Sequence, residues 1–348
     1  MIRDISLLAT THGSLPYMDP DDAIDEIIRY TPDMPTWPQL PKIGYKHNMI
    51  AQFAHDIPGA VIDEETRNVF LDVSSVPAND LESYYERLLG EDPTRFSLDE
   101  DHFPGLHHLA ARSAQLKSAK AVKGHMSGPV TMGTQILTGD KTPVLYGETE
   151  MELLLKALKM KGRWQQEFLQ KFNPNTILIV DEPSLTLLGS PCVPIQKESA
   201  ANLINEVMGG IGGLKGIHCC GNTDWGALMD LDIDVLSFDA YSFADTLALY
   251  TSDVESFLSR GGRLAWGITP TSDANIERET VDTLMTRFHE GVGQLVDKGI
   301  GVNTILDSSL ITPACGLGMV TPANAVKALN LTSELSFRLR KQYAGGGM

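Results

Sequence analysis

A histidine and a cysteine two residues apart, His218 and Cys220, have the clearest potential for chemistry. Side chains at this spacing in an extended backbone point to the same side, and Cys219 between them points the other way, toward packing. An imidazole nitrogen and a thiolate are ligands that Zn²⁺ prefers. Cys315 could supply a third ligand and leave one coordination position open, as in catalytic zinc sites. A histidine and cysteines that only pack in the core are the alternative interpretation.

Acidic residues form a second candidate group. Asp181 and Glu182 directly follow one predicted strand, and Asp239 follows another. Carboxylates at such positions could bind an ammonium group or complete a metal site. An aspartate before a turn also commonly caps the next helix, and this interpretation stays open for both aspartates.

A third candidate group lies near the beginning of the chain, within residues 10–16. Gly13 permits close approach of the backbone to a ligand, and Ser14 with its amide could bind a carboxylate. Gly-Ser before proline also occurs in many ordinary turns. Cys192 has no histidine nearby, so we expect a passive thiol there.

Most of these residues lie close to short, continuously apolar segments that we predict to be strands. Continuous rather than alternating apolar character is typical of a parallel sheet covered on both faces. Segments with helical spacing separate them, at 147–172, 199–208 and 277–298, and Asp-Pro at 19–20 and Thr-Pro at 321–322 mark helix starts. The predicted strands span residues 5–11, 121–126, 176–180, 214–219, 235–238, 264–268 and 302–306, with a weaker candidate at 68–73.

The alternation of strands and helices predicts an α/β fold with a parallel sheet. Seven or eight such units favour a single (β/α)8 TIM barrel over residues 1–348 rather than an open sheet. No Gly-x-Gly-x-x-Gly follows the first predicted strand, which disfavours a dinucleotide-binding fold. The active site of such barrels lies at the C-terminal ends of the strands, so all three candidate groups are expected at one rim.

The composition excludes classes of partner. The 348 residues include 28 Lys+Arg and 45 Asp+Glu, a formal net charge of −17, which argues against nucleic acid and against an anionic membrane surface. No apolar stretch reaches the ~18 residues of a transmembrane helix, and the first residues do not resemble a signal peptide. Four cysteines, two of them adjacent, do not indicate a disulfide framework. We therefore expect a cytoplasmic protein, whose oligomeric state the sequence does not predict.

Five segments of the sequence resemble a known family. Residues 179–183 (Ile-Val-Asp-Glu-Pro), 218–220 (His-x-Cys) and 313–317 (Pro-Ala-Cys-Gly-Leu) resemble the catalytic C-terminal half of cobalamin-independent methionine synthase. Residues 123–131 look like that family's Lys-Gly-x-x-Thr-Gly-Pro-Val-Thr, and 12–16 are similar to its Ile-Gly-Ser-Phe-Pro. Uroporphyrinogen decarboxylase and the methylcobalamin:coenzyme M methyltransferases are wider relatives that share the barrel.

The resemblance implies a metal site. His218, Cys220 and Cys315 match zinc ligands of the family, and Asp239 matches a glutamate ligand, one methylene longer, which makes it a candidate fourth ligand. A free alkyl thiol has a pKa of roughly 8.5, and coordination to Zn²⁺ converts it to the thiolate. The nucleophile would then be the zinc-bound thiolate of the substrate, and no protein general base is assigned.

The resemblance also implies an amino-acid substrate. Asp181 matches the carboxylate that holds the amino group of homocysteine, and Ser14, next to Gly13, matches a residue at its carboxyl group. A catalytic histidine that the family carries before Ser-Pro has no counterpart here, where residues 268–271 read Ile-Thr-Pro-Thr. We therefore expect a homocysteine S-methyltransferase that makes methionine, an enzyme of amino-acid biosynthesis.

The expected methyl donor follows from the length of the chain. The full synthase has a second, N-terminal barrel that helps to bind methyltetrahydrofolate, and this chain has room for one barrel. It resembles instead the short methionine synthases that use methylcobalamin on a corrinoid protein. Direct transfer from methyltetrahydrofolate and methylation of coenzyme M are alternatives, although coenzyme M has no ammonium group for Asp181 to bind. A non-catalytic zinc-binding subunit of a methyltransferase complex is an alternative of a different class.

Overall fold

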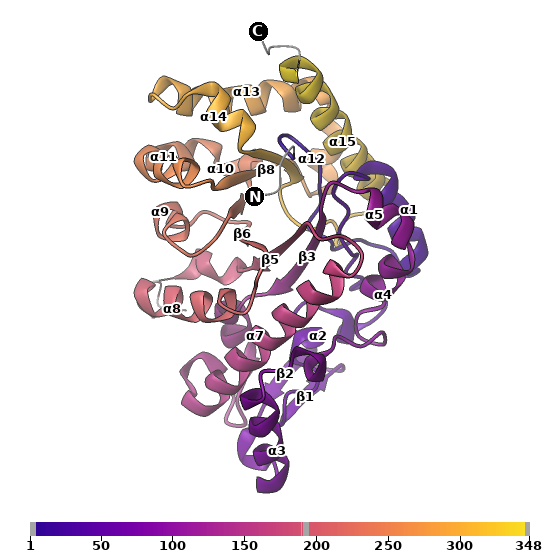
Figure 1. The fold of residues 1–348 in the computed structure, drawn as a ribbon, viewed down its shortest axis with the longest axis vertical. Coiled ribbons are helices and arrows are strands. Elements are labelled where there is room, and N and C mark those ends of the chain that lie inside the picture. Colours follow the sequence, from indigo (N-terminus) through magenta and orange to yellow (C-terminus); the bar gives the residue numbers. More distant parts are fainter. Residues whose placement is uncertain (1–4, 189, 191–194, 345–348) are drawn as a thin grey trace.

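The computed structural model describes residues 5–188, 190 and 195–344, so Cys192 lies outside the described residues. Its main element is a curled six-stranded parallel sheet in which neighbouring strands follow chain order and helices pack outside (Figure 1). The α/β fold with a parallel sheet and the strands predicted between residues 121 and 268 are confirmed. The six strands are β3 (Val122–Ser127), β5 (Thr176–Asp181), β6 (Leu214–Cys219), β7 (Val235–Phe238), β8 (Arg263–Thr269) and β9 (Ser309–Pro313).

Two predicted strands are wrong, and a third belongs to another sheet. Residues 302–306 lie in a helix, α14 (Val302–Asp307), which buries Ile305 and Leu306 on one face, and the last strand is β9 instead. Residues 5–11 form no regular strand because Leu7 adopts a φ of 57°, which interrupts the extended backbone. Residues 68–73 contain β2 (Asn68–Leu71), which lies outside the six-stranded sheet. It pairs with β1 (Ala60–Asp63) and β4 (Ile136–Leu137) in a small separate sheet.

Single bridges extend both edges of the six-stranded sheet. Residues 9–15 pair with β9 through Ala9 and with residues 36–39 through Ser14. Residues 36–39 pair in turn with β3 through Thr36. A continuous series of backbone pairings therefore connects one edge of the sheet with the other and brings the segment around Ser14 next to the first and last strands.

The helices between the strands pack mainly against the outer face of the sheet, and the predicted helices at 147–172, 199–208 and 277–298 are confirmed as α7, α8 and α13. Asp19 caps α1 with Pro20 in its first turn, as predicted. The helices up to α7 are α1 (Pro20–Tyr30), α2 (Ala51–Ala54), α3 (Ala78–Leu89), α4 (Pro104–Ala111), α5 (Ser113–Ser118), α6 (Pro129–Gln135) and α7 (Glu148–Gln170). Those that follow are α8 (Lys197–Met208), α9 (Trp225–Met229), α10 (Ala240–Leu247), α11 (Thr251–Ser259), α12 (Asp273–Arg278), α13 (Val281–Asp297), α14 and α15 (Pro322–Ala344).

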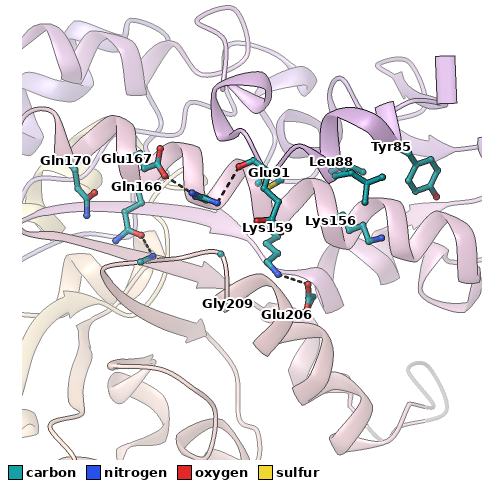
Figure 2. A pocket seen from close by; sticks show the side chains of 15 residues that line it. Tyr85, Leu88, Glu91, Lys156, Lys159, Gln166, Glu167, Gln170, Glu206 and Gly209 are labelled. Carbon is teal, nitrogen blue, oxygen red and sulfur yellow. Dashed lines mark hydrogen bonds and ion pairs between the residues drawn. The ribbon is translucent and has the colours of Figure 1, made fainter. Parts of the chain in front are cut away.

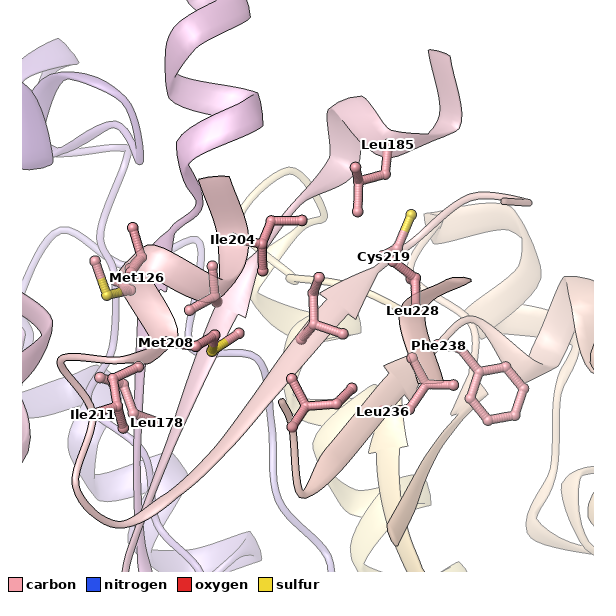
Figure 3. Packing of buried hydrophobic residues seen from close by; sticks show 14 of the residues in the cluster. Met126, Leu178, Leu185, Ile204, Met208, Ile211, Cys219, Leu228, Leu236 and Phe238 are labelled. Carbon is pink, nitrogen blue, oxygen red and sulfur yellow. The ribbon is translucent and has the colours of Figure 1, made fainter. Parts of the chain in front are cut away.

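A small cluster of buried apolar side chains, which includes Ile177, Ile179 and Leu310, lies on the inner face of the sheet. The main core lies between the outer face of the sheet and these helices. Cys219 of β6 is fully buried in it, together with Leu185, Leu228 and Phe238 (Figure 3). The alternation of side chains along β6 therefore directs Cys219 into the core and its neighbours away from it. None of the helices in the described part of the chain is long and apolar enough to span a membrane.

Candidate active site

Three side chains of the metal-binding type lie together at the carboxyl ends of the strands. His218 is the second-last residue of β6, Cys220 directly follows that strand, and Cys315 follows β9. One imidazole nitrogen and the two sulfur atoms all lie within 4.8 Å of one another. The imidazole is buried, whereas both cysteines are partly exposed. Residues 95 positions apart (315 − 220) are therefore brought to one place on the rim.

The histidine of this group is oriented by a neighbouring strand. The Oγ of Ser237 in β7 lies 3.1 Å from Nδ1 of His218. Donation from Nδ1–H leaves Nε2 with a lone pair, and this buried atom has no hydrogen-bond partner. Metal-binding histidines characteristically donate their other ring N–H to a polar group in this way. An unpaired imidazole nitrogen beside two thiols fits a zinc ion.

The two thiols have opposite acidities. The hydrogen bond from Cys315 and the contact with His218 lower the pKa of Cys220 far below that of an ordinary thiol. The same hydrogen bond, together with burial, raises the pKa of Cys315. One thiolate is thus available near neutral pH, and a divalent cation would favour ionisation of the second.

A histidine that the sequence did not single out lies against this group. The ring of His12 stacks on that of His218 with 3.9 Å between centroids, and its Nε2 donates to the carbonyl of Pro313 at 3.0 Å. Burial, and then the proximity of His218, lower the pKa of His12 well below its ordinary value. A neutral His12 is therefore packed between β9 and the imidazole of the candidate ligand. The sequence feature that could have identified His12 is its position directly before Gly13, within the third candidate group.

Asp181 lies beside the same group, at the end of β5 and in register with His218 of β6. Its Oδ1 is buried without a hydrogen-bond partner, and its Oδ2 is 3.8 Å from Nδ1 of His125. Burial raises the pKa of Asp181 to about 6. Burial also lowers the pKa of Lys123 to about 8, and the ammonium of Lys123 donates to the carbonyl of Thr11 at 2.8 Å. A buried carboxylate with a free oxygen at a strand end can hold an ammonium group.

His125, which faces Asp181, is fixed by its other neighbours. Its ring stacks on Trp37 with 3.8 Å between centroids, and its Nε2 donates to the carbonyl of Trp37 at 3.2 Å. Gly13 approaches from the opposite segment with a φ of +105°, and a Cβ there would lie only 2.4 Å from Nε2 of His125. Glycine is therefore required at position 13 for two reasons, the positive φ of its backbone and the lack of space for a Cβ beside His125.

Replacing Gly13 with alanine should consequently lower the free energy of unfolding by about 2–5 kcal/mol, the sum of a left-handed residue and an overpacked contact. Gly293 in α13 is the matched control, because a Cβ there meets nothing within 4 Å. Gly293→Ala should be neutral or stabilise the protein by up to about 1 kcal/mol. Urea unfolding followed by circular dichroism measures both, and equal stabilities of Gly13→Ala and wild type would contradict the assignment.

Ser14 packs against the loop that carries Cys315. The amide of Leu317 donates to the Ser14 carbonyl at 2.8 Å. A Cβ on Gly316 would lie 2.8 Å from Cβ of Ser14, and one on Gly318 would lie 2.3 Å from its Oγ. Ser14 and the third candidate ligand are thus neighbours on the rim.

The other two acidic candidates, Asp239 and Glu182, accept hydrogen bonds from backbone amides at the starts of helices. Asp239 caps α10, accepting from the amide of Ser242 at 2.9 Å, and burial raises its pKa. It does not join the described group of His218 and the two cysteines. Glu182 is fully buried and turns toward the start of α6, where it accepts from the amides of Val130 and Thr131 at 2.8 and 2.7 Å. Asp181, not Glu182, is therefore the carboxylate with an oxygen free at the site.

Several cavities lie outside this group. One of about 580 Å³ lies beside the turn after β5, where Pro183 and Ser184 line it. Another of about 800 Å³ lies on the outer surface along α3, α7 and α8 (Figure 2). Four of its charged side chains are paired with one another, since Lys159 contacts Glu206 at 2.8 Å and Arg163 contacts Glu167 at 3.0 Å. None of the residues proposed from the sequence lines the outer cavity.

Comparison with known proteins identifies the fold. No protein-family model and no curated protein sequence matches the chain. A B12-independent methionine synthase from Shewanella sp. W3-18-1, solved in complex with selenomethionine, is similar over 98% of this chain and 99% of its own, with a TM-score of 0.62 and 14% identity. A putative vitamin-B12 independent methionine synthase from Listeria monocytogenes is similar over 92% of this chain and 86% of its own, with a TM-score of 0.56 and 14% identity. The chain therefore has a methionine synthase-like fold.

Proposed function

We propose that the protein is a zinc-dependent methyltransferase that methylates the thiol of homocysteine to give methionine. The observation that carries this proposal is the grouping of His218, Cys220 and Cys315 beside Asp181, whose buried Oδ1 has no partner. The first three residues supply a soft metal site, and the fourth supplies a charge for an amino acid. Both functions lie at the carboxyl ends of parallel strands, where barrel enzymes carry their active sites.

The proposal includes the architecture of a single (β/α)8 barrel. Six regular strands and the two extended segments at 9–15 and 36–39 would make its eight positions, linked by the bridges of Ala9, Ser14 and Thr36. The similar Shewanella chain, which this chain matches over almost the full length of both, supports one such unit.

His218, Cys220 and Cys315 would hold the zinc ion. When bound, Zn²⁺ would lower the pKa of the substrate thiol and keep a sulfur nucleophile available at neutral pH. By accepting from Nδ1–H of His218, Ser237 would leave Nε2 as the nitrogen with a lone pair for the metal. The ring of His12 stacks on the imidazole of His218. These contacts hold the imidazole in one orientation before any ligand binds.

The amino-acid part of the substrate would be oriented by the protein alone. Asp181 would bind the ammonium group, with His125 holding the far side of the carboxylate. Gly13, which lies against His125, and Ser14, which lies against the loop of Cys315, would contact the carboxyl group. Fixing both charged ends places the sulfur next to the two cysteines, so binding energy is used for orientation. The Shewanella protein, whose structure contains selenomethionine, supports an amino acid of this kind.

The methyl donor is the part of the earlier prediction that receives no support. Both similar proteins are named as B12-independent, which weighs against methylcobalamin on a corrinoid protein. The proposal is therefore limited to the acceptor, with the donor to be identified by assay. A coenzyme M-type acceptor fits less well, because its sulfonate would lie near the buried Asp181 without a cation between them.

Purified protein loaded with zinc should form methionine from homocysteine with one member of a donor panel that includes methylcobalamin and methyltetrahydrofolate. Liquid chromatography with mass spectrometry measures methionine, and coenzyme M replaces homocysteine as a control acceptor. Methylation of coenzyme M at the higher rate would contradict the proposed acceptor. Calorimetry that detects no binding of homocysteine to the zinc-loaded protein would support a non-catalytic zinc-binding subunit instead.

A further inference from the structure

A second group of metal-binding side chains lies away from the strand ends. His55 follows α2, whereas Asp99 and His102 lie in the loop before α4. Their three candidate ligand atoms all lie within 4.8 Å of one another. The two imidazole rings stack with 3.5 Å between centroids and an angle of 16°. None of these residues belongs to the candidate active site.

The two distances from the carboxylate oxygen to the imidazole nitrogens match those around a tetrahedral ion. Oδ2 of Asp99 lies 3.4 Å from Nε2 of His55 and 3.2 Å from Nδ1 of His102. Two ligands that each lie about 2.0–2.1 Å from a tetrahedral Zn²⁺ are roughly 3.3–3.4 Å apart. One carboxylate oxygen is therefore spaced from both nitrogens as a shared ion would require. Since an imidazole binds a metal in the plane of its ring, one of the two stacked rings would turn on binding, and the ion would replace the 2.9 Å contact between Nδ1 of His102 and Oδ1 of Asp99.

The backbone at each ligand is held by contacts that do not depend on an ion. The buried ammonium of Lys161 in α7 donates to the carbonyl of His55 at 2.6 Å and pairs with Asp56 at 2.6 Å. The amide of His102 donates to Oδ1 of Asp99 at 3.0 Å. Because these contacts fix the positions from which the side chains project, only the side chains would need to be ordered when an ion binds.

The geometry points to a second zinc site formed by His55, Asp99 and His102, which is independent of the proposed function. Two imidazoles and one carboxylate suit Zn²⁺, whereas Mg²⁺ and Ca²⁺ prefer sites made of oxygen ligands. The side chains of His55 and Asp99 are 39% and 40% exposed, so an ion and a water ligand can reach the site from solvent.

An ion at this place would act as a structural bridge. It would join residue 55 to residues 99 and 102, and the segment between them contains β1, β2 and α3. That part of the chain lies at one end of the molecule, remote from α13 and α14 (Figure 1). Since the unfolded chain does not bring these ligands together, zinc would bind the folded state selectively and stabilise it.

The test is the zinc content of purified protein after loading with Zn²⁺ and gel filtration, measured by mass spectrometry. We expect about two ions per chain in wild type and about one in His55→Phe, which keeps a stacked ring and removes the ligand nitrogen. Asp99→Ala should also hold about one. His108→Ala is the matched control and should hold about two, because His108 contacts Asp21 and Glu100 but belongs to neither metal group.

The double variant Cys220→Ser, Cys315→Ser isolates the second site. It should keep about one zinc ion and lose that ion on the further change His55→Phe. With Co²⁺ in place of zinc, the double variant should show visible d–d bands but no sulfur-to-cobalt charge-transfer band. A thermal unfolding midpoint that rises with added Zn²⁺ in this variant supports the site. Equal zinc contents of His55→Phe and wild type would overturn the inference. If the rim held no zinc, wild type would contain about one ion and His55→Phe none, which supports this inference and contradicts the proposed function.

Discussion

Changing Cys220 or Cys315 to serine should remove one zinc ion per chain and lower the rate of methionine formation by more than about 100-fold. Substitution of groups that only orient a metal ligand costs about 10–100-fold, so loss of a ligand should cost more. Both sulfur atoms lie within 4.8 Å of the imidazole nitrogen of His218, and no other described cysteine does. Metal analysis and the methionine assay measure the two effects on the same samples.

Cys219→Ala is the matched control for these variants. Cys219 is adjacent to Cys220, yet it is fully buried in the core, and burial raises its pKa to about 12. It should keep the wild-type zinc content and lose only stability, because a small buried side chain is truncated. Full zinc occupancy in both Cys220→Ser and Cys315→Ser would contradict the assignment of the rim ligands.

Changing Asp181 to asparagine should weaken homocysteine binding by roughly 30-fold or more and leave the zinc content unchanged. Loss of one partner from a buried, hydrogen-bonded charge pair costs about 2–5 kcal/mol, and 2 kcal/mol corresponds to roughly 30-fold in affinity. Calorimetry with homocysteine measures the effect. Asp232→Asn is the control, since Asp232 pairs with Lys215 at 2.6 Å on the exposed surface. An unchanged affinity of Asp181→Asn would exclude Asp181 as the ammonium partner.

The same carboxylate predicts a dependence of binding on pH. Burial raises the pKa of Asp181 to about 6, so the carboxylate is ionised above that pH and protonated below it. The ammonium group of homocysteine stays charged throughout this range. Binding of the substrate sulfur to zinc as a thiolate releases a proton in wild type and in Asp181→Asn alike, so the ratio of the two affinities isolates the effect of Asp181. This ratio should be constant above about pH 7 and fall toward one below about pH 5. Calorimetry of both proteins across this range measures the ratio, and a ratio that does not change with pH, or that rises as the pH is lowered, would contradict this role of Asp181.

The positions of the candidate ligands could be predicted from local patterns. The apolar segments at β5 and β6 end abruptly in Asp181 and His218, so strand ends and rim residues were identifiable together. Cys315 could be proposed as a third ligand because it follows the last predicted strand, although that strand was placed at 302–306. That segment forms a helix in which Ile305 and Leu306 are buried, and a short apolar run does not by itself distinguish a helix from a strand.

The contacts that orient those ligands could not be predicted. His12 stacks on His218, and His125 faces Asp181, through pairings between segments far apart in the chain. His55 and Asp99 are 99 − 55 = 44 residues apart and have no motif spacing, so only the folded chain brings them together. Leu7 also shows the limit of patterns, because a positive φ at an apolar residue interrupts a segment that reads as a strand.

X-ray absorption at the zinc edge tests the central claim most directly. His55→Phe protein should be used, so that the spectrum reports only zinc at the rim. The ligands His218, Cys220 and Cys315 predict a first shell with two sulfur atoms and at least one nitrogen, and a third sulfur should appear when homocysteine is added. A first shell without sulfur, or a sulfur content that homocysteine does not change, would contradict a thiol-methylating zinc site.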